Sequence, residues 1–192
     1  MNFPRIYLAS KSPRRRELLS QIGVEFSVLS VDVDESRLGD EAPATYVERV
    51  AIAKAQAGWD SLDNDNKRPV LGSDTSVVLA DSILGKPKNN DDACRMLQQL
   101  SGRNHQVMTA VAIVIGTQIE CELVISEVSF ATLTATEIEW YLSTKEGVDK
   151  AGGYAIQGLA AIFIKHIQGS YSGIMGLPVR ETALLLGKLN EQ

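Results

Sequence analysis

The sequence predicts an α/β fold in which a mixed β-sheet is flanked by helices. Strand-like and helix-like segments alternate over the first part of the chain, which is typical of parallel strands joined by helices. Two long β-rich segments joined by a short turn occupy the middle, which is typical of an antiparallel hairpin. With 192 residues, 44% of them hydrophobic, the chain can bury one sizeable core, and we expect a single domain over residues 1–192.

The charge balance restricts the classes of ligand. The chain carries 19 Lys and Arg against 24 Asp and Glu, a net charge of −5, which argues against a general nucleic-acid or membrane-surface binder. No apolar run approaches the roughly 20 residues that span a bilayer, and the N-terminus lacks the apolar segment of a signal peptide, so we expect a cytoplasmic protein. Cys94 and Cys121 belong to no CxxC pattern and are expected to be free, buried thiols.

The first strand and helix form a basic turn. Residues 6–9 are expected to be a strand, Ser12 suits the N-cap of a helix that Pro13 begins, and Gly23 ends that helix. Three arginines, at 14–16, lie in its first turn. Free backbone N–H groups beside arginines favour a phosphate site, and a capped helix with solvated arginines is the alternative.

An acidic segment follows the second expected strand, residues 25–30. Carboxylates recur at Asp32, Asp34 and Glu35. A solvated loop is the simpler interpretation, and a source of hard oxygen ligands for a divalent ion is the alternative.

The next expected helix covers residues 44–58, because Val47, Val50, Ala51 and Ala55 share one face at three- and four-residue spacing. Lys54 lies close to that apolar face. Taken alone it is better explained as a surface lysine whose stem covers apolar neighbours. Residues 61–68 are polar and are expected to form a loop.

A carboxylate interrupts an expected buried strand, residues 70–79. Asp74 stands there between apolar flanks. Burying an unpaired carboxylate costs several kcal/mol or more, so we expect Asp74 to have a cation, a metal or a fixed hydrogen-bond donor beside it. We therefore take Asp74 as the centre of the candidate site.

The second half of the chain supplies further elements. After a turn at 80–82, Lys86 and Lys88 lie on a stiff loop from which they could contact phosphate as point charges. A helix capped by Asn90 or Asp91 is expected to run to residue 100, and residues 106–115 and 119–133 are expected to form the hairpin.

The C-terminal part is expected to hold two helices and one strand. A capping box from Thr134 to Glu137 opens a helix on which Trp140 is expected to pack rather than to stack on a base. The glycine-rich segment 149–158 fits neither a dinucleotide-binding motif nor a P-loop. Residues 161–167 are expected to be a strand, and a last helix opens at 177–178 and runs to about 189.

Two kinds of charged residue stand out as candidates. They are the carboxylates Asp74, Glu35 and Asp34, and the cations Arg14, Arg15, Lys54 and Lys86. Hydrolysis of a phosphoanhydride requires a divalent metal, an oriented water and cations on the phosphates. Because His105 and His166 are the chain's two histidines, oxygen-ligated Mg²⁺ or Mn²⁺ is more plausible than zinc. These residues indicate metal-dependent chemistry on a phosphorylated ligand.

Seven short segments follow one another along nearly the whole chain: LASKSPRR at 8–15, VDE at 33–35, AKA at 53–55, LGSDT at 71–75, GKP at 85–87, DKAGGYAIQG at 149–158 and GLP at 176–178. Together, in this order, they resemble the Maf family of nucleoside triphosphate pyrophosphatases. The resemblance implies a Maf/ITPase-like fold, with a twisted mixed sheet and two lobes around a central cleft. It also implies metal-dependent hydrolysis between the α and β phosphates, and a homodimer is a family expectation.

The resemblance assigns roles to individual residues. Asp74 corresponds to the catalytic aspartate, as proton acceptor or metal ligand, and Glu35 to its acidic partner and second tentative metal ligand. Lys54 and Lys86 correspond to the phosphate-facing lysines. The family's N-terminal Ser-Arg turn corresponds to four residues here: Ser10, Ser12, Arg14 and Arg15.

Three positions indicate the substrate. Arg14, Thr75 and Gln157 resemble the subgroup that acts on dTTP and UTP, whereas the methylguanosine-triphosphate subgroup typically has an aromatic residue, Gln and Glu there. An amide such as that of Gln157 can both donate to and accept from a uracil or thymine edge. Ser73 and Gly153 depart from the usual alanines and leave the substrate breadth open. The alternatives are a pyrophosphatase for modified nucleotides and a nucleotide-binding regulator of cell division, linked to septum formation, without turnover.

Overall fold

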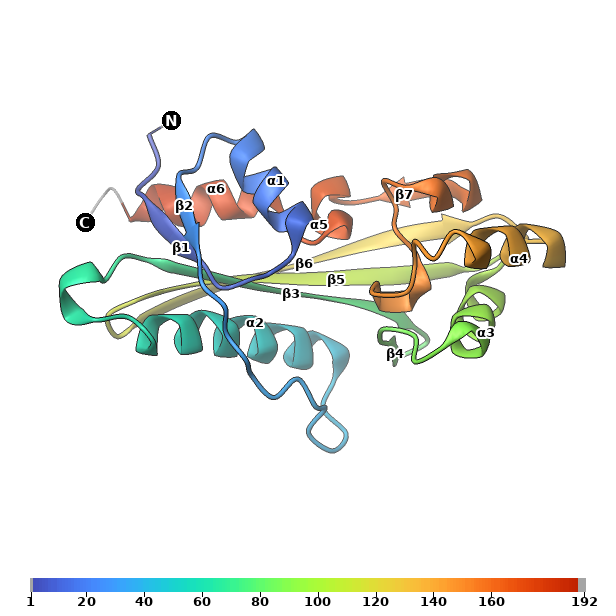
Figure 1. Ribbon diagram of the computed structural model, residues 1–192, viewed down its shortest axis with the longest axis horizontal. Coiled ribbons are helices and arrows are strands. Elements are labelled where there is room, and N and C mark those ends of the chain that lie inside the picture. Colours follow the sequence, from blue (N-terminus) through green and yellow to red (C-terminus); the bar gives the residue numbers. More distant parts are fainter. Residues whose placement is uncertain (1, 190–192) are drawn as a thin grey trace.

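The computed structural model describes residues 2–189 and contains one seven-stranded mixed sheet with helices against both faces (Figure 1). The strands are β1 (Ile6–Leu8), β2 (Phe26–Val28), β3 (Val70–Leu79), β4 (Ser82–Leu84), β5 (Asn104–Ile115), β6 (Gln118–Phe130) and β7 (Ile164–Gln168). The α-helices are α1 (Pro13–Gln21), α2 (Pro43–Asp60), α3 (Asn90–Leu100), α4 (Ala135–Ser143), α5 (Tyr171–Met175) and α6 (Val179–Lys188). Short 3-10 helices are η1 (Asn64–Asn66), η2 (Ala151–Gly153) and η3 (Leu159–Phe163).

The sheet is parallel at one end and antiparallel at the other. Its order is β2-β1-β3-β5-β6-β7, with β4 also paired to β3. Strand β1 runs parallel to both β2 and β3, whereas the remaining pairs are antiparallel. The expected α/β fold with a mixed sheet is therefore confirmed.

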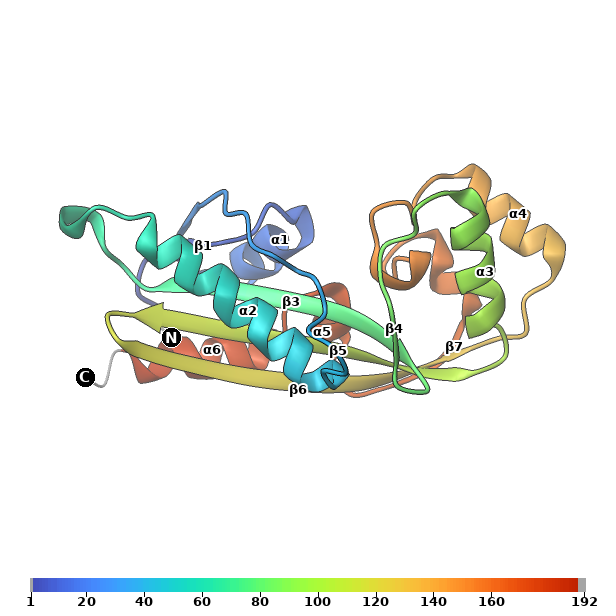
Figure 2. The ribbon, with the colours of Figure 1, turned by 90° about the horizontal axis from the view of Figure 1, so that it is seen from below.

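The helices divide the molecule into two lobes. In the large lobe, α1 and α6 cover one face of the sheet and α2 covers the other (Figure 1). In the small lobe, α3 and α4 lie together at the far end of the long strands (Figure 2). Strand β5 contributes to the core of both lobes, with Val111 and Ile113 in the large lobe and Val107 in the small one.

Helix α2 packs directly against the backbone of β3. A Cβ on Gly72 would lie 2.4 Å from the carbonyl oxygen of Ala51 and 2.6 Å from the amide nitrogen of Ala55. The small residues on the α2 face therefore meet a strand position without a side chain, and the two elements approach closely. This approach brings Lys54, on the same helix, over the middle of β3.

One edge of β3 is open at its centre. Strand β1 pairs with Val70 and Leu71, and β4 pairs with β3 from Val77 onward. Within residues 2–189, no strand pairs with 72–76 on that edge, although β5 pairs with them on the other. Side chains from both faces of β3 can therefore reach the space beside this edge, and Asp74 lies at its middle.

Several boundaries differ from the sequence-based expectations. Residues 161–163 belong to the 3-10 helix η3 rather than to a strand, and β6 ends at Phe130 instead of reaching residue 133. The cap of α3 is Asn89, whose side chain accepts a hydrogen bond from the Asp92 amide, rather than Asn90 or Asp91. Helix α5 was not expected.

Some expected side-chain roles are also revised. Ser12 stands at the N-cap of α1, but its side chain makes no capping hydrogen bond. Cys94 and Cys121 are free thiols that are partly rather than fully buried. Trp140 packs edge to face on Phe163, as expected.

Candidate active site

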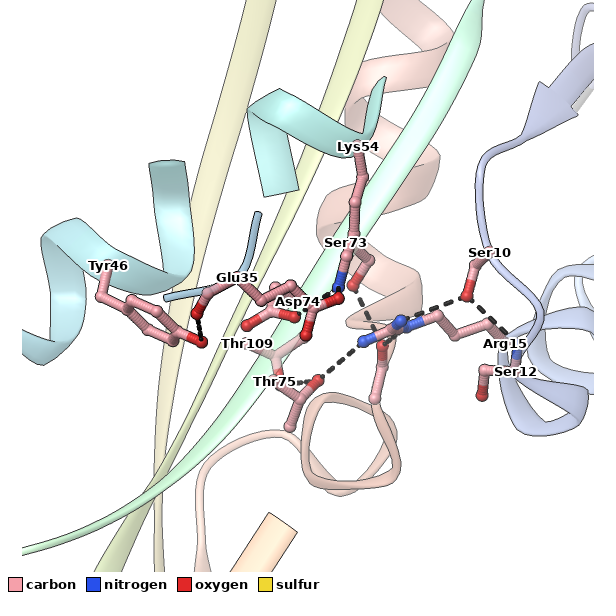
Figure 3. A network of polar contacts seen from close by, with 11 residues as sticks. Ser10, Ser12, Arg15, Glu35, Tyr46, Lys54, Ser73, Asp74, Thr75 and Thr109 are labelled. Carbon is pink, nitrogen blue, oxygen red and sulfur yellow. Dashed lines mark hydrogen bonds and ion pairs between the residues drawn. The ribbon is translucent and has the colours of Figure 1, made fainter. Parts of the chain in front are cut away.

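Two carboxylates share one lysine at the open edge of β3 (Figure 3). Lys54 Nζ lies 2.8 Å from Asp74 Oδ1 and 2.8 Å from Glu35 Oε1. The side chains of Lys54 and Asp74 are 13% and 10% exposed, whereas that of Glu35 is 46% exposed. Asp74 thus has the cationic partner that a buried carboxylate requires. The interpretation of Lys54 as a surface lysine is wrong, because its side chain is largely buried.

The loop that carries Glu35 is fixed to α2. Tyr46 Oη donates to the Glu35 carbonyl oxygen at 2.9 Å, and Arg49 donates to the Ser36 carbonyl oxygen at 2.9 Å while pairing with Glu41. Burial acts to raise the pKa of Glu35, but the hydrogen bond and charge of Lys54, with the charges of Lys86 and Arg15, hold it below its usual value. Glu35 is therefore ionised at neutral pH.

Asp34, the neighbouring carboxylate, does not join this group. Its side chain is exposed and accepts hydrogen bonds from the amide and hydroxyl of Ser36. These bonds lower the pKa of Asp34. The acidic segment is thus solvated at Asp34, whereas Glu35 contacts Lys54, and its role as a source of metal ligands stays a prediction.

Arg15 connects three parts of the chain. Its Nε donates to the Gly176 carbonyl oxygen at 2.8 Å, Nη1 to Ser10 Oγ at 3.2 Å and Nη2 to Thr75 Oγ1 at 3.2 Å (Figure 3). Ser73 Oγ donates to the same carbonyl oxygen at 3.1 Å. Burial lowers the pKa of Arg15, and the charge of Asp74 opposes this effect. Arg15 thus joins α1, β3 and the turn after α5, and two of its N–H groups stay available.

Other cations around the same space have unused donors. Arg14 is partly buried and makes no hydrogen bond or ion pair within residues 2–189, and burial lowers its pKa against the opposing charge of Asp149. Lys86 is exposed, and its charge contributes to the low pKa of Glu35. Its loop is tied to the glycine-rich segment by a hydrogen bond from the Gly152 amide to the Gly85 carbonyl oxygen, at 3.0 Å.

These side chains line one cleft of about 940 Å³ between the lobes. All ten residues predicted for the site line it: Ser10, Ser12, Arg14, Arg15, Glu35, Lys54, Asp74, Thr75, Lys86 and Gln157. Residues from the glycine-rich segment and from the turn after α5 complete its walls. Around the Asp74–Glu35 pair the cleft thus presents Arg14, Arg15, Lys54 and Lys86, a combination suited to a polyanionic ligand and a divalent ion.

The carboxylate pair fits a magnesium-type ion. In the described part of the chain, no group of three or more His, Cys, Asp and Glu side chains could hold a metal by itself. Magnesium, however, is usually held by one or two carboxylates together with substrate phosphates and water. Asp74 and Glu35 each direct one oxygen at Lys54 and keep the other, which fits such shared ligation.

The sequence did not single out several residues that the structure places around the site. Two of these residues are Tyr46 and Thr109. Tyr46 Oη donates to the carbonyl oxygen of Glu35, and Thr109 Oγ1 lies 3.0 Å from Thr75 Oγ1. Their only sequence signal is a polar atom within an otherwise apolar helix or strand pattern. Glu146 and Tyr141 are two more, and they support the loop that carries Gln157.

The fold and the cleft define an α/β protein in which two carboxylates and several cations face one cleft. The sequence matches the Maf-like protein family over residues 5–189, so the chain belongs to that family. It is 55% identical to a dTTP/UTP pyrophosphatase of Pseudoalteromonas atlantica over 96% of this chain and 97% of that protein. Proteins with the same name from Alkalilimnicola ehrlichii and Chromobacterium violaceum are 52% and 50% identical, over 95% and 97% of this chain and 92% and 96% of theirs.

A solved structure, that of the Staphylococcus aureus Ham1 protein, aligns with a TM-score of 0.49 at 15% identity, over 67% of this chain and 72% of that one. This likeness is too low to add to the family assignment. Separately, none of the helices within residues 2–189 is both long and apolar enough to cross a bilayer.

Proposed function

We propose that this protein is a pyrophosphatase that hydrolyses dTTP and UTP between the α and β phosphates, giving the nucleoside monophosphate and pyrophosphate. The observation that carries the proposal is the ion-paired group of Asp74, Lys54 and Glu35 in a cleft lined by further cations. The names of relatives that are at least 50% identical over nearly the whole chain support the choice of substrate.

Asp74 is the group that we assign to the attacking water. A carboxylate oxygen at the open edge of β3 can accept a proton from water, or it can ligate a metal. The ion pair with Lys54, 2.8 Å away, keeps Asp74 oriented, and Lys54 in turn holds Glu35 beside it. Because Asp74 and Glu35 are both ion-paired to Lys54 before the ligand binds, these three side chains need little rearrangement during the reaction.

Asp74 and Glu35 are the residues that would hold Mg²⁺ or Mn²⁺. When bound, such an ion neutralises charge that develops on the phosphates and lowers the pKa of its water. The low pKa of Glu35 keeps that carboxylate ionised and ready as a ligand at neutral pH.

The cations are assigned to the phosphate chain. Arg14 and Lys86 have no competing partner within residues 2–189, and Ser10 and Ser12 add hydroxyls at the same wall of the cleft. Arg15 supports this wall through Ser10 and Thr75 and directs its remaining N–H groups at the ligand. Arg14, Thr75 and Gln157 are the residues we assign to substrate selection, with Gln157 contacting the pyrimidine edge.

The test is release of pyrophosphate from a panel of dTTP, UTP, CTP, ATP, GTP and methylguanosine triphosphate, with and without Mg²⁺ or Mn²⁺. We expect metal-dependent release mainly from dTTP and UTP, and its loss in Asp74→Asn. Asp91→Asn, which changes an exposed carboxylate on α3, is the matched control and should retain activity. Unchanged turnover in Asp74→Asn would overturn the assignment of Asp74.

The same experiment decides against the rival function. A regulator that binds nucleotides without turnover would bind members of the panel and release pyrophosphate from none of them with either metal. Equal release from every nucleotide would instead indicate a pyrophosphatase of broad specificity. The homodimer stays a prediction, which sedimentation equilibrium of the intact chain can check.

A further inference from the structure

Gln157 stands at the tip of a tight turn. The Gly158 amide donates to the Ala155 carbonyl oxygen at 3.1 Å, which closes the turn, and Gln157 is exposed to the cleft. Its amide makes no hydrogen bond to any of the residues that the structure describes. Its orientation toward a ligand must therefore come from the backbone that carries it.

One pair of side chains holds that backbone on both sides of Gln157. Before it, the Ala155 amide donates to Tyr141 Oη at 3.2 Å. After it, the Leu159 amide donates to Glu146 Oε2 at 2.9 Å and the Ala160 amide lies 3.4 Å from Glu146 Oε1. The two side chains are joined to each other, because Tyr141 Oη donates to Glu146 Oε1 at 3.0 Å.

The chemistry of the pair suits this task. Burial and the charge of Glu146 raise the pKa of Tyr141, so its phenol stays protonated. The phenol O–H therefore donates a hydrogen bond to the Glu146 carboxylate. The phenol oxygen is then free to accept the Ala155 amide. The carboxylate of Glu146 accepts the orphan N–H groups at the start of η3, in the manner of a helix cap.

The packing beneath the turn is equally restrictive. A Cβ on Gly158 would lie 2.3 Å from Glu146 Oε2 and 2.4 Å from Oε1, so the carboxylate lies flat against the backbone of the residue that follows Gln157. Tyr141 is 1% exposed and packs edge to face on Phe163. Tyr141 and Glu146 therefore connect the buried core of the small lobe to the turn that carries Gln157.

We propose that Glu146 is a positioning residue for base selection, which acts by fixing the turn that presents Gln157 to the ligand. This inference rests on the proposed function, because it concerns which nucleotides the same cleft accepts. Glu146 lines the cleft but is assigned no contact with the attacking water, which is assigned to Asp74, or with the phosphates, which are assigned to Arg14 and Lys86. Its loss should therefore alter the discrimination between bases more than the hydrolysis itself.

The primary variant is Glu146→Gln, in which an NH₂ group replaces one acceptor oxygen and faces the backbone N–H groups of η3. Glu139→Gln, on the exposed face of α4, is the matched control. We expect the ratio of kcat/KM for dTTP over CTP and GTP to fall ~10-fold in Glu146→Gln and to stay unchanged in the control. An equal loss with all nucleotides, or an unchanged ratio, would overturn the proposal.

A second readout does not depend on activity. Hydrogen exchange of the free protein should be faster across residues 155–161 in Glu146→Gln, with other segments unaffected. Unchanged exchange there would also overturn the proposal. Tyr141→Phe, which keeps the ring and removes the hydroxyl, should lower the same selectivity ratio. It replaces Glu146→Gln as the test variant if Glu146→Gln does not fold.

The outcomes separate this inference from the proposed function. A wild-type protein that releases pyrophosphate from no nucleotide would overturn both. Release by the wild-type protein, together with unaltered selectivity in the folded variants, would overturn the role of Glu146 alone.

Discussion

Gly72 on β3 and Ala51 on α2 lie so close that a Cβ on Gly72 would be 2.4 Å from the carbonyl oxygen of Ala51. This contact sets the height of α2 above β3. The same height determines how far Lys54 must reach to contact Asp74, at 2.8 Å. A packing contact between two small residues thus controls the geometry of the ion pair.

Gly72→Ala should therefore destabilise the fold. The added methyl group must push α2 away from β3, and overpacking of this kind typically costs about 1–3 kcal/mol of unfolding free energy. Pyrophosphate release should fall as well, because Lys54 moves with the helix. Urea unfolding and the release assay measure the two effects.

Gly187→Ala provides the control for that substitution. Gly187 lies in α6, and apart from its two chain neighbours and the backbone of that helix no described atom lies within 4 Å of the position that an added methyl group would occupy. Alanine there should therefore be neutral or slightly stabilising. Equal unfolding free energies for Gly72→Ala and the wild type would show that α2 can move away from β3 without loss of stability.

Lys54→Gln should abolish most turnover. It removes the cation that neutralises Asp74 and Glu35 and leaves the largely buried Asp74 carboxylate without its ion pair. Loss of one preorganised electrostatic partner typically lowers kcat about 10²–10³-fold. Lys188→Gln breaks an exposed pair with Glu120, which should matter little, and kcat for dTTP in both variants checks the expectation.

Gln157→Glu should weaken the preference for dTTP and UTP. A carboxylate cannot donate a hydrogen bond to the pyrimidine edge, and a lost base contact costs roughly 1–3 kcal/mol in kcat/KM. Gln98→Glu, on the exposed side of α3, makes the same chemical change at a residue that does not line the cleft. If Gln157→Glu lowered kcat/KM equally for every nucleotide, Gln157 would be a scaffold residue rather than a base contact.

His105 should make the fold sensitive to acid. Burial lowers the pKa of His105 to about 4, with Nε2 2.8 Å from Tyr154 Oη and Nδ1 among the buried atoms without a partner in the described chain. Between its unfolded pKa of about 6.5 and about 4, the unfolded chain binds a proton that the folded protein does not. The free energy of unfolding therefore falls as pH decreases through this range.

The expected loss is about 3 kcal/mol over that window, since each unit of pKa shift is worth about 1.4 kcal/mol. Urea unfolding at several pH values should show that this fall in the free energy of unfolding is absent in His105→Gln. It should be retained in His166→Gln, which changes an exposed histidine. An identical pH dependence in wild type and His105→Gln would mean that His105 is protonated within the fold.

Local patterns predicted the elements that carry the carboxylates and the lysine. The strand from Val70 to Leu79 was predicted with its observed bounds, because apolar residues surround Asp74 on both sides. The residues 161–163 were wrongly expected to be strand, since a short apolar run suits a strand and a buried 3-10 turn equally well. Helix α5 has five residues, too few for a helical period to show.

Contacts across the cleft were beyond local patterns. Lys54 alone had the pattern of a surface lysine, and only the close approach at Gly72 places it on Asp74. Glu146 lies in a polar stretch whose sequence suits a solvated loop, yet its partner at Leu159 is thirteen residues further along the chain. Such pairings are set by the packing of whole elements rather than by neighbours in sequence.

Strand β5 runs without interruption through the cores of both lobes, and it is paired along its length with β3 and β6. Within residues 2–189 this strand joins the two lobes directly, so rotating one lobe against the other would bend a continuous hydrogen-bonded ladder. We therefore expect adjustment to a ligand to come from side chains such as Arg14 and Lys86, which line the cleft and have no hydrogen-bond or ion-pair partner within residues 2–189. The paired strands hold Asp74 in place, so the cleft can bind a ligand without moving the carboxylate at its centre.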